Sequence, residues 1–222
     1  MPAPTWDLVI FDCDGVLVDS EPIGNRIFTA MLVDLGLRIT PAEAMHDFVG
    51  RSMASCVEII EQRLGRPVPP DFVTTLQART FAAFEGALEA VPGIEAALDA
   101  IDAMGWPTCV ASSGEHRKMH TTLGLTRLLP RFEGRLFSAT EVPRGKPHPD
   151  LFLHAAARMG AAPARCAVVE DSPVGARAGI AAGMTVFGFA ARTDPRLLAD
   201  AGAIVFEDMT RLPTLLASQA LR

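Results

Sequence analysis

The chain has 222 residues, of which 49% are hydrophobic and 21% charged, and its formal net charge is −6. This balance allows a buried core in one or two domains and excludes a disordered chain. The acidic total disfavours nucleic acid and anionic membranes as partners. The longest largely apolar run, residues 178–191, is shorter than the ~18 residues of a membrane-spanning helix. With no signal-peptide pattern at residues 1–7 and no long exposed apolar stripe, we expect a cytoplasmic monomer outside any membrane.

The four cysteines are widely spaced and never form a C-x-x-C pair: Cys13, Cys56, Cys109 and Cys166. Three of them lie in or beside apolar runs, where a free cysteine behaves as a small hydrophobic residue. We expect buried, reduced thiols, with disulfides or a zinc site as the alternatives.

The first predicted element is a buried strand at residues 7–11. From Ser20 to Ala87 no strand is evident, and amphipathic stretches predict helices at 22–35, 41–48, 53–64 and 71–84. This pattern predicts an all-helical domain, residues 20–87, inserted after the first strand. Residues 1–19 and 88–222 would form the core, with hinges at Ser20 and at residues 91–93.

The rest of the chain alternates between strands and helices. Apolar runs predict strands at 107–111, 164–169, 184–189 and 203–206, and helices are predicted at 93–104, 116–124, 149–159 and 173–182. Near-continuous apolar strands separated by helices are typical of an α/β protein with a parallel sheet covered on both faces. Ligands of such sheets bind beyond the carboxyl ends of the strands, so the helical insert would stand near the site as a lid.

Two carboxylates, Asp12 and Asp14, come directly after the first strand, and Gly15 frees the turn that follows. Such a pair is explained either by ordinary turn chemistry or by a catalytic or metal-binding role. A calcium loop does not, because Val16 and Leu17 stand where that motif needs an acidic residue or Asn and then a glycine.

Polar residues also follow the later strands. Ser112 and Ser113 lie at a strand-to-helix turn, where hydroxyls and backbone N–H groups can bind an anion, although Ser113 could simply cap the helix. Lys146 lies between a glycine and a proline, as a surface lysine or a phosphate ligand. The adjacent carboxylates of Glu170 and Asp171 would repel each other unless a cation such as Mg²⁺ relieved them.

Taken together, these motifs meet at one edge of the predicted sheet. Carboxylates for a divalent metal would lie beside a hydroxyl and an amine for a phosphate, and an Asp can act as a covalent nucleophile. At this point the chain resembles the haloacid dehalogenase superfamily of phosphohydrolases. Residues 12–20 are similar to its first signature, and Ser112, Lys146 and residues 170–175 are similar to the other three.

The resemblance covers essentially the whole chain, including the helical insert, and implies a Rossmann-like core with an all-helical cap. Within the superfamily, the sequence looks like the β-phosphoglucomutases and sugar-phosphate phosphatases, and it also resembles the phosphoglycolate phosphatases. It implies that Asp12 attacks phosphorus to form an aspartyl-phosphate, and that Asp14 protonates the leaving alkoxide and then activates water. Ser112, Ser113 and Lys146 would hold phosphoryl oxygens.

Mg²⁺ is the implied cofactor. It would be bound by the Asp12 carboxylate, the Asp14 main-chain carbonyl and Asp171, with Glu170 nearby or acting through water. The implied acid/base Asp14 argues against dehalogenation, because dehalogenases are not expected to carry this residue. The implied partner is therefore a small-molecule phosphate ester.

Two positions bear on specificity. Gly24 stands where β-phosphoglucomutases carry a histidine that helps gate the acid/base group, which favours hydrolysis over mutase chemistry. Gly50 and Arg51 fall where the family places its specificity loop, and Arg51 either reads a second anionic group of the substrate or is a solvated turn residue.

The predicted function is a Mg²⁺-dependent phosphatase acting on a sugar phosphate, a sugar-acid phosphate or phosphoglycolate. A hexose-phosphate mutase of the β-phosphoglucomutase type is one alternative. A catalytically silent sugar-phosphate sensor is another. A phospho-acceptor receiver domain fits less well, because receivers lack a helical cap and place their phosphorylated Asp after the third strand.

Overall fold

The computed structural model describes residues 6–48 and 53–219, and it divides into two compact units. The core unit contains the chain up to Asp19 and from Glu89 onward, and the helical unit runs from Ser20 to Leu88. We describe each unit by itself.

The core unit is built on a six-stranded parallel sheet, which confirms the predicted α/β class. Its strands are β1 (Leu8–Phe11), β2 (Thr108–Ser112), β3 (Leu136–Ser138), β4 (Cys166–Glu170), β5 (Thr185–Phe189) and β6 (Ile204–Phe206). The strand order is β3-β2-β1-β4-β5-β6. From the central pair β1 and β4, the sheet extends through β2 and β3 on one side and through β5 and β6 on the other. Such a switch in strand order opens a crevice at the carboxyl ends of the central strands.

The register of the sheet places the ends of β1, β2 and β4 within two residues of one another. Phe11 lies opposite both Val110 of β2 and Val169 of β4. The N–H of Asp12 then donates to the Val169 carbonyl at 2.9 Å. Side chains that follow these three strands are thereby brought to one edge of the sheet.

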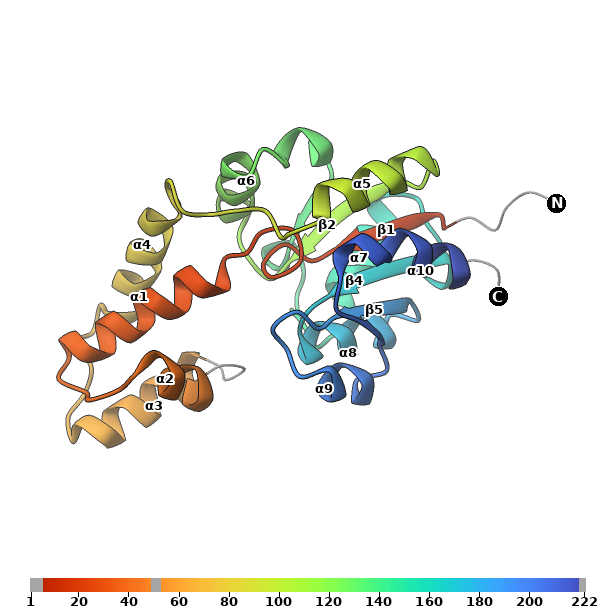
Figure 1. Cartoon of the computed structure of the whole chain (residues 1–222). Coiled ribbons are helices and arrows are strands. Elements are labelled where there is room, and N and C mark those ends of the chain that lie inside the picture. Colours follow the sequence, from red (N-terminus) through yellow and green to blue (C-terminus); the bar gives the residue numbers. More distant parts are fainter. Residues whose placement is uncertain (1–5, 49–52, 220–222) are drawn as a thin grey trace. The chain divides into compact units, whose positions relative to one another are not determined.

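Helices of the core unit cover the sheet and supply its hydrophobic core. They are α5 (Ile94–Ala103), α6 (His116–Leu125), α7 (Asp150–Arg158), α8 (Pro173–Ala181), α9 (Pro195–Asp200) and α10 (Leu212–Gln219), with 3₁₀ turns at Leu129–Phe132, Ala139–Glu141, Pro163–Arg165 and Met209–Arg211. One large cluster joins Leu8 and Ile10 of β1 to Phe152 of α7, Ala178 of α8 and Leu198 of α9. Figure 1 shows the strands side by side with α8 and α9 along one side of the sheet.

The helical unit has a hydrophobic core of its own. It comprises α1 (Glu21–Asp34), α2 (Pro41–Phe48), α3 (Met53–Leu64) and α4 (Phe72–Phe84), which matches the all-helical insert predicted after the first strand. Helix α2 begins as its sequence predicts, because Thr40 and Glu43 cap it reciprocally: the Thr40 N–H donates to Glu43 at 2.8 Å and the Glu43 N–H donates to the Thr40 hydroxyl at 3.2 Å. Leu32, Phe48 and Phe72 are among the residues buried between the four helices.

The structure differs from the sequence predictions at three elements. Five strands are predicted and six are present: the three-residue strand β3 was missed, because the run Leu136-Phe137-Ser138 contains only two apolar residues and shows no clear strand pattern. Helices α9 and α10 were also not predicted. They have six and eight residues, and neither segment was singled out by the hydrophobic pattern of the sequence.

All four cysteines are free and buried, which confirms the expected reduced thiols. Among the helices that the structure describes, none is long and apolar enough to cross a membrane.

Candidate active site

The centre of the site is the ammonium group of Lys146, which lies between two carboxylates. Its Nζ donates to Asp12 Oδ1 at 2.7 Å and to Glu170 Oε1 at 2.5 Å, and it lies 4.9 Å from the centre of the Phe152 ring. The Lys146 side chain is 5% exposed and that of Glu170 is 1% exposed. A buried cation paired in this way ties the loop before α7 to the ends of β1 and β4.

Glu170 is held on its other side by the start of α8. Its Oε2 accepts hydrogen bonds from the Ser172 N–H at 2.9 Å and the Ser172 hydroxyl at 2.8 Å. The same hydroxyl caps α8 by accepting from the Gly175 N–H at 3.0 Å. An added Cβ at Gly175 would lie 1.7 Å from Glu170 Oε1, so only a glycine lets the helix approach this carboxylate.

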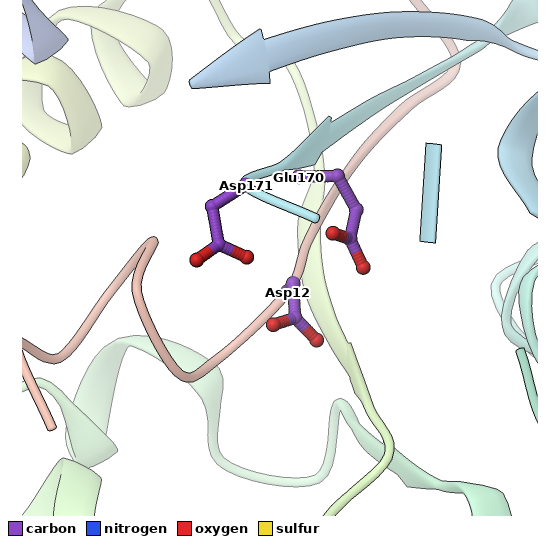
Figure 2. A group of neighbouring side chains, drawn as sticks. All are labelled: Asp12, Glu170 and Asp171. Carbon is purple, nitrogen blue, oxygen red and sulfur yellow. The ribbon is translucent and has the colours of Figure 1, made fainter. Parts of the chain in front are cut away.

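A cluster of three carboxylates suits a hard cation. Asp12, Glu170 and Asp171 each have a carboxylate oxygen within 4.8 Å of the others. Figure 2 shows Glu170 and Asp171 leaving the end of β4 in opposite directions, with Asp12 between them. Lys146 and Ser172 engage both oxygens of Glu170, and carboxylate oxygens such as those of Asp12 and Asp171 are the ligands that a hard cation such as Mg²⁺ prefers.

The turn after β1 fits closely against this cluster. The Gly15 N–H donates to the Val18 carbonyl at 2.8 Å, and Gly15 has a φ of +75°. An added Cβ at Gly15 would lie 2.0 Å from Asp171 Oδ2. A glycine is therefore needed here both for the left-handed backbone and for the approach of the Asp171 carboxylate.

Asp14, the second predicted carboxylate, has a different partner from Asp12. Its Oδ2 accepts from the Nζ of Lys118 on α6 at 2.6 Å. Sequence reasoning did not single out Lys118. It lies on a helix, 104 residues away in the sequence from Asp14, and a lone lysine there has no motif around it. The rarity of lysine in this chain is the sequence feature that could have pointed to Lys118.

The predicted anion-binding turn lies at the end of β2. Ser112 is 2% exposed, and its hydroxyl accepts from the Gly114 N–H at 3.1 Å. The alternative role of Ser113 as the helix cap is wrong, because Glu115 precedes α6 and no side chain caps that helix. Ser113 is exposed at the same turn. Gly50 and Arg51, the predicted specificity residues, lie outside the described part of the chain.

Burial and the facing charges shift the pKa values of the central groups. Burial raises the pKa of Asp12 to about 7, and Lys146 opposes this rise while Glu170 adds to it. Burial would lower the pKa of Lys146, but the attraction of Asp12 and Glu170 outweighs it and holds the pKa above its usual value. Lys118 behaves in the same way beside Asp14. Both lysines therefore remain cationic at neutral pH.

The family model of haloacid dehalogenase-like hydrolases matches residues 6–183 of this chain. The chain belongs to this family. It is 35% identical over 210 residues to the 6-phosphogluconate phosphatase of Escherichia coli (strain K12), and the match covers 94% of each chain. It is also 32% identical over 197 residues to hexitol phosphatase B of the same strain, covering 86% of this chain and 88% of that one.

A solved structure of a haloacid dehalogenase family hydrolase from Deinococcus radiodurans R1 has the same fold. It matches with a TM-score of 0.84 and 35% identity, covering 99% of this chain and 98% of that one, and it holds bound phosphate and sodium. The predicted family and the predicted hydrolase class are therefore confirmed. The two Escherichia coli phosphatases agree with the expectation of a phosphoric monoester hydrolase.

Proposed function

We propose that this protein is a Mg²⁺-dependent phosphatase that hydrolyses small sugar, sugar-acid or polyol phosphates through an aspartyl-phosphate. The observation that carries the proposal is the arrangement around Lys146, which sets the carboxylate of Asp12 beside a buried cation and close to Asp171. The names of the two relatives, a 6-phosphogluconate phosphatase and a hexitol phosphatase, support this class of substrate.

The first chemical step belongs to Asp12. Its carboxylate oxygen attacks phosphorus, the bond from phosphorus to the sugar oxygen breaks, and the leaving oxygen takes a proton from the carboxyl group of Asp14. Lys146 and the Ser112–Gly114 turn donate hydrogen bonds to the phosphoryl oxygens as their negative charge shifts.

The second step regenerates the enzyme. The Asp14 carboxylate takes a proton from water, whose oxygen attacks the phosphorus of the aspartyl-phosphate. The bond from phosphorus to Asp12 breaks, and inorganic phosphate leaves.

The residues present fit a Mg²⁺ ion. Asp12 and Asp171, with the main-chain carbonyl of Asp14, would hold it, and Glu170 would act chiefly by holding Lys146. When bound, the ion offsets the charge of the phosphoryl group beside these carboxylates. An ionised Asp12 is the form that binds the metal and attacks phosphorus, so metal binding counteracts the raised pKa of this residue.

We assign the chemistry to the core unit and a specificity-setting role to the helical unit, residues 20–88. Gly50 and Arg51 stay the predicted specificity residues. Gly24 on α1 offers no side-chain donor, which supports hydrolysis over the mutase alternative. A monomeric state and a cytoplasmic location remain predictions.

The test is phosphate release from a panel of phosphate esters with Mg²⁺ or with EDTA. The panel contains hexose phosphates, hexitol phosphates, 6-phosphogluconate and phosphoglycolate. We expect turnover of at least one compound with Mg²⁺ alone, and its loss in Asp12→Asn. Asp102→Asn, which changes an exposed carboxylate paired with Arg131, is the matched control and should keep full activity.

Two outcomes would favour the alternatives. Isomerisation of a hexose phosphate that requires a sugar bisphosphate would indicate a mutase. A folded protein that binds phosphate esters with Mg²⁺ but never releases phosphate would indicate a sensor.

A further inference from the structure

Lysine is rare in this chain, and both lysines lie at the candidate active site. Of the 20 basic residues, 18 are arginine and two are lysine, Lys118 and Lys146. Lys146 contacts Asp12, and Lys118 contacts Asp14. Each carboxylate of the pair after β1 therefore has an ammonium partner of its own, while the other basic positions carry arginine.

The two lysines are held differently. Lys146 is 5% exposed and lies between two carboxylates, so it is fixed from both sides. The Lys118 side chain is 38% exposed, and that of its partner Asp14 is 28% exposed. Among the described residues, Lys118 has Asp14 as its carboxylate partner, at 2.6 Å, a length typical of a strong charge-assisted hydrogen bond.

Helix α6 is docked so that Lys118 reaches this carboxylate. Thr122 lies one turn beyond Lys118 on the same helix face and is fully buried. Its hydroxyl lies 3.8 Å from the Sγ of Cys13, the residue before Asp14. Cys13 and Asp14, which are neighbours in the turn after β1, therefore contact Thr122 and Lys118 of α6. These two contacts set the distance between the helix and Asp14.

The stem of Lys118 also has a defined path. An added Cβ at Gly114 would lie 3.3 Å from Lys118 Cδ, tighter than an ordinary van der Waals contact. The glycine in the turn after β2 thus leaves room for the lysine to pass from α6 toward Asp14.

The orientation of the Asp14 carboxylate matters for the proton transfer proposed above. The backbone of residue 14 is fixed by the turn, which bridges Asp14 to Val18, and the Lys118 ammonium holds one oxygen of the partly exposed side chain. A proton donor acts only when it lies within hydrogen-bond reach of the leaving oxygen. We propose that Lys118 is a positioning residue, which holds the Asp14 carboxylate in the orientation used for proton transfer. This role rests on the phosphatase function proposed above.

The first experiment tests the contact without using activity. Protein labelled with ¹³C at the lysine ε-carbon should give two lysine signals, and Lys118→Met identifies the signal of Lys118. We expect Asp14→Asn to shift that signal while Asp102→Asn leaves both unchanged. The proposal would be overturned if the Lys118 signal had the chemical shift of free lysine and did not move in Asp14→Asn.

The second experiment separates positioning from substrate binding and from a purely structural role. It compares single-turnover phosphoryl transfer from a sugar phosphate, whose alkoxide needs a proton, with transfer from p-nitrophenyl phosphate, whose phenolate does not. We expect Lys118→Met to slow the first by about 10- to 100-fold and the second by less than about threefold, with substrate affinity changed less than about threefold. Lys118→Arg should recover part of the lost rate, and Arg117→Met on the same helix should leave the ratio of the two rates unchanged.

Three results would overturn the positioning role. Equal slowing of both substrates would indicate a structural effect, unchanged rates would indicate no role, and a loss of affinity at unchanged rates would make Lys118 a substrate ligand. A wild type inactive on every ester would instead remove the proposed phosphatase function, and the lysine signals would still show whether the contact exists.

Discussion

Buried charge at single residues accounts for much of the chemistry of this site. Asp12 is 7% exposed and lies near Glu170, so its ionised form depends on Lys146 and on any metal bound there. An isolated carboxylate in such a place would favour its protonated form. Because a proton and a cation compete for the Asp12 carboxylate, the ionisation of this residue is sensitive to pH near neutrality.

A pH dependence of metal binding follows from Asp12. Burial raises its pKa from 3.8 to about 7, so the folded metal-free protein keeps a proton that the unfolded chain releases. The stability gained from this proton is fully present below about pH 4 and is lost as the pH rises through about 7. Because Mg²⁺ needs the ionised carboxylate, we expect its apparent dissociation constant to fall by up to about tenfold per pH unit from about pH 5.5 to 7, and then to level off.

Thermal melting at increasing Mg²⁺ concentration, repeated across this pH range, measures the effect. Asp12→Asn should remove most of the slope. A wild-type affinity for Mg²⁺ that is independent of pH would contradict the assignment.

At the scale of secondary-structure elements, the start of α8 links helix stability to the site. The Ser172 hydroxyl caps the helix by accepting from the Gly175 N–H and also donates to Glu170. The adjoining Pro173 suits the first helical turn, where its missing N–H needs no partner. One side chain therefore both starts the helix and holds the carboxylate that orients Lys146.

Replacing this cap should affect stability and activity together. We expect Ser172→Ala to lower the free energy of unfolding by about 1–2 kcal/mol, because it loses the cap and a hydrogen bond to a buried carboxylate. Phosphatase activity should fall by about tenfold, as is common when a residue behind a metal or phosphate ligand is removed. Urea unfolding and steady-state kinetics measure the two effects.

Asp194→Ala is the matched control, since Asp194 caps α9 in the same way by accepting from the Arg196 N–H at 2.9 Å. It should reduce stability and leave activity unchanged. Equal losses of activity in both variants would show that the effect of Ser172 is a general loss of stability.

At the scale of the whole molecule, a few long-range polar contacts hold distant segments at one edge of the sheet. Lys146 is separated by 134 residues from Asp12 and by 24 from Glu170. These contacts link the ends of β1 and β4 to the loop that carries Lys146. The hydrophobic cluster alone would not specify which polar groups meet there.

Removing this central cation should destabilise the core unit. Lys146→Met would leave two buried carboxylates without their counter-ion, which typically costs about 3–5 kcal/mol. The loss should be largest at about pH 7.5 and smaller in acid, where Asp12 can take up a proton instead. Chemical unfolding at the two pH values measures it, with loss of phosphatase activity as a second readout.

Arg144→Met provides the comparison on the same loop. Arg144 forms an exposed ion pair with Asp150, so its loss should not measurably change stability. If the Lys146 variant were as stable as this control at both pH values, the buried pairs would not hold the fold in the way described.

The order of elements and most of the site could be predicted from local sequence. Short apolar runs predicted five of the six strands, and polar motifs directly followed three of them. Since the carboxyl ends of parallel strands meet at one edge, Asp12, Ser112 and Glu170 could be expected near one another before any coordinates were known. The helical insert was equally evident, because its amphipathic stretches contain no strand-like run.

The tertiary structure alone decided which charges meet. No local pattern distinguishes a lysine on the surface of α6, so the contact of Lys118 with Asp14 depends on how that helix docks against the turn after β1. The same holds for Glu170, whose sequence neighbourhood predicted a metal ligand and whose contacts make it the partner of Lys146 and Ser172. Sequence determined which chemical groups reach the edge of the sheet, because strand ends are a local property. Packing determined their partners, because a hydrogen bond requires two segments to meet within about 3 Å.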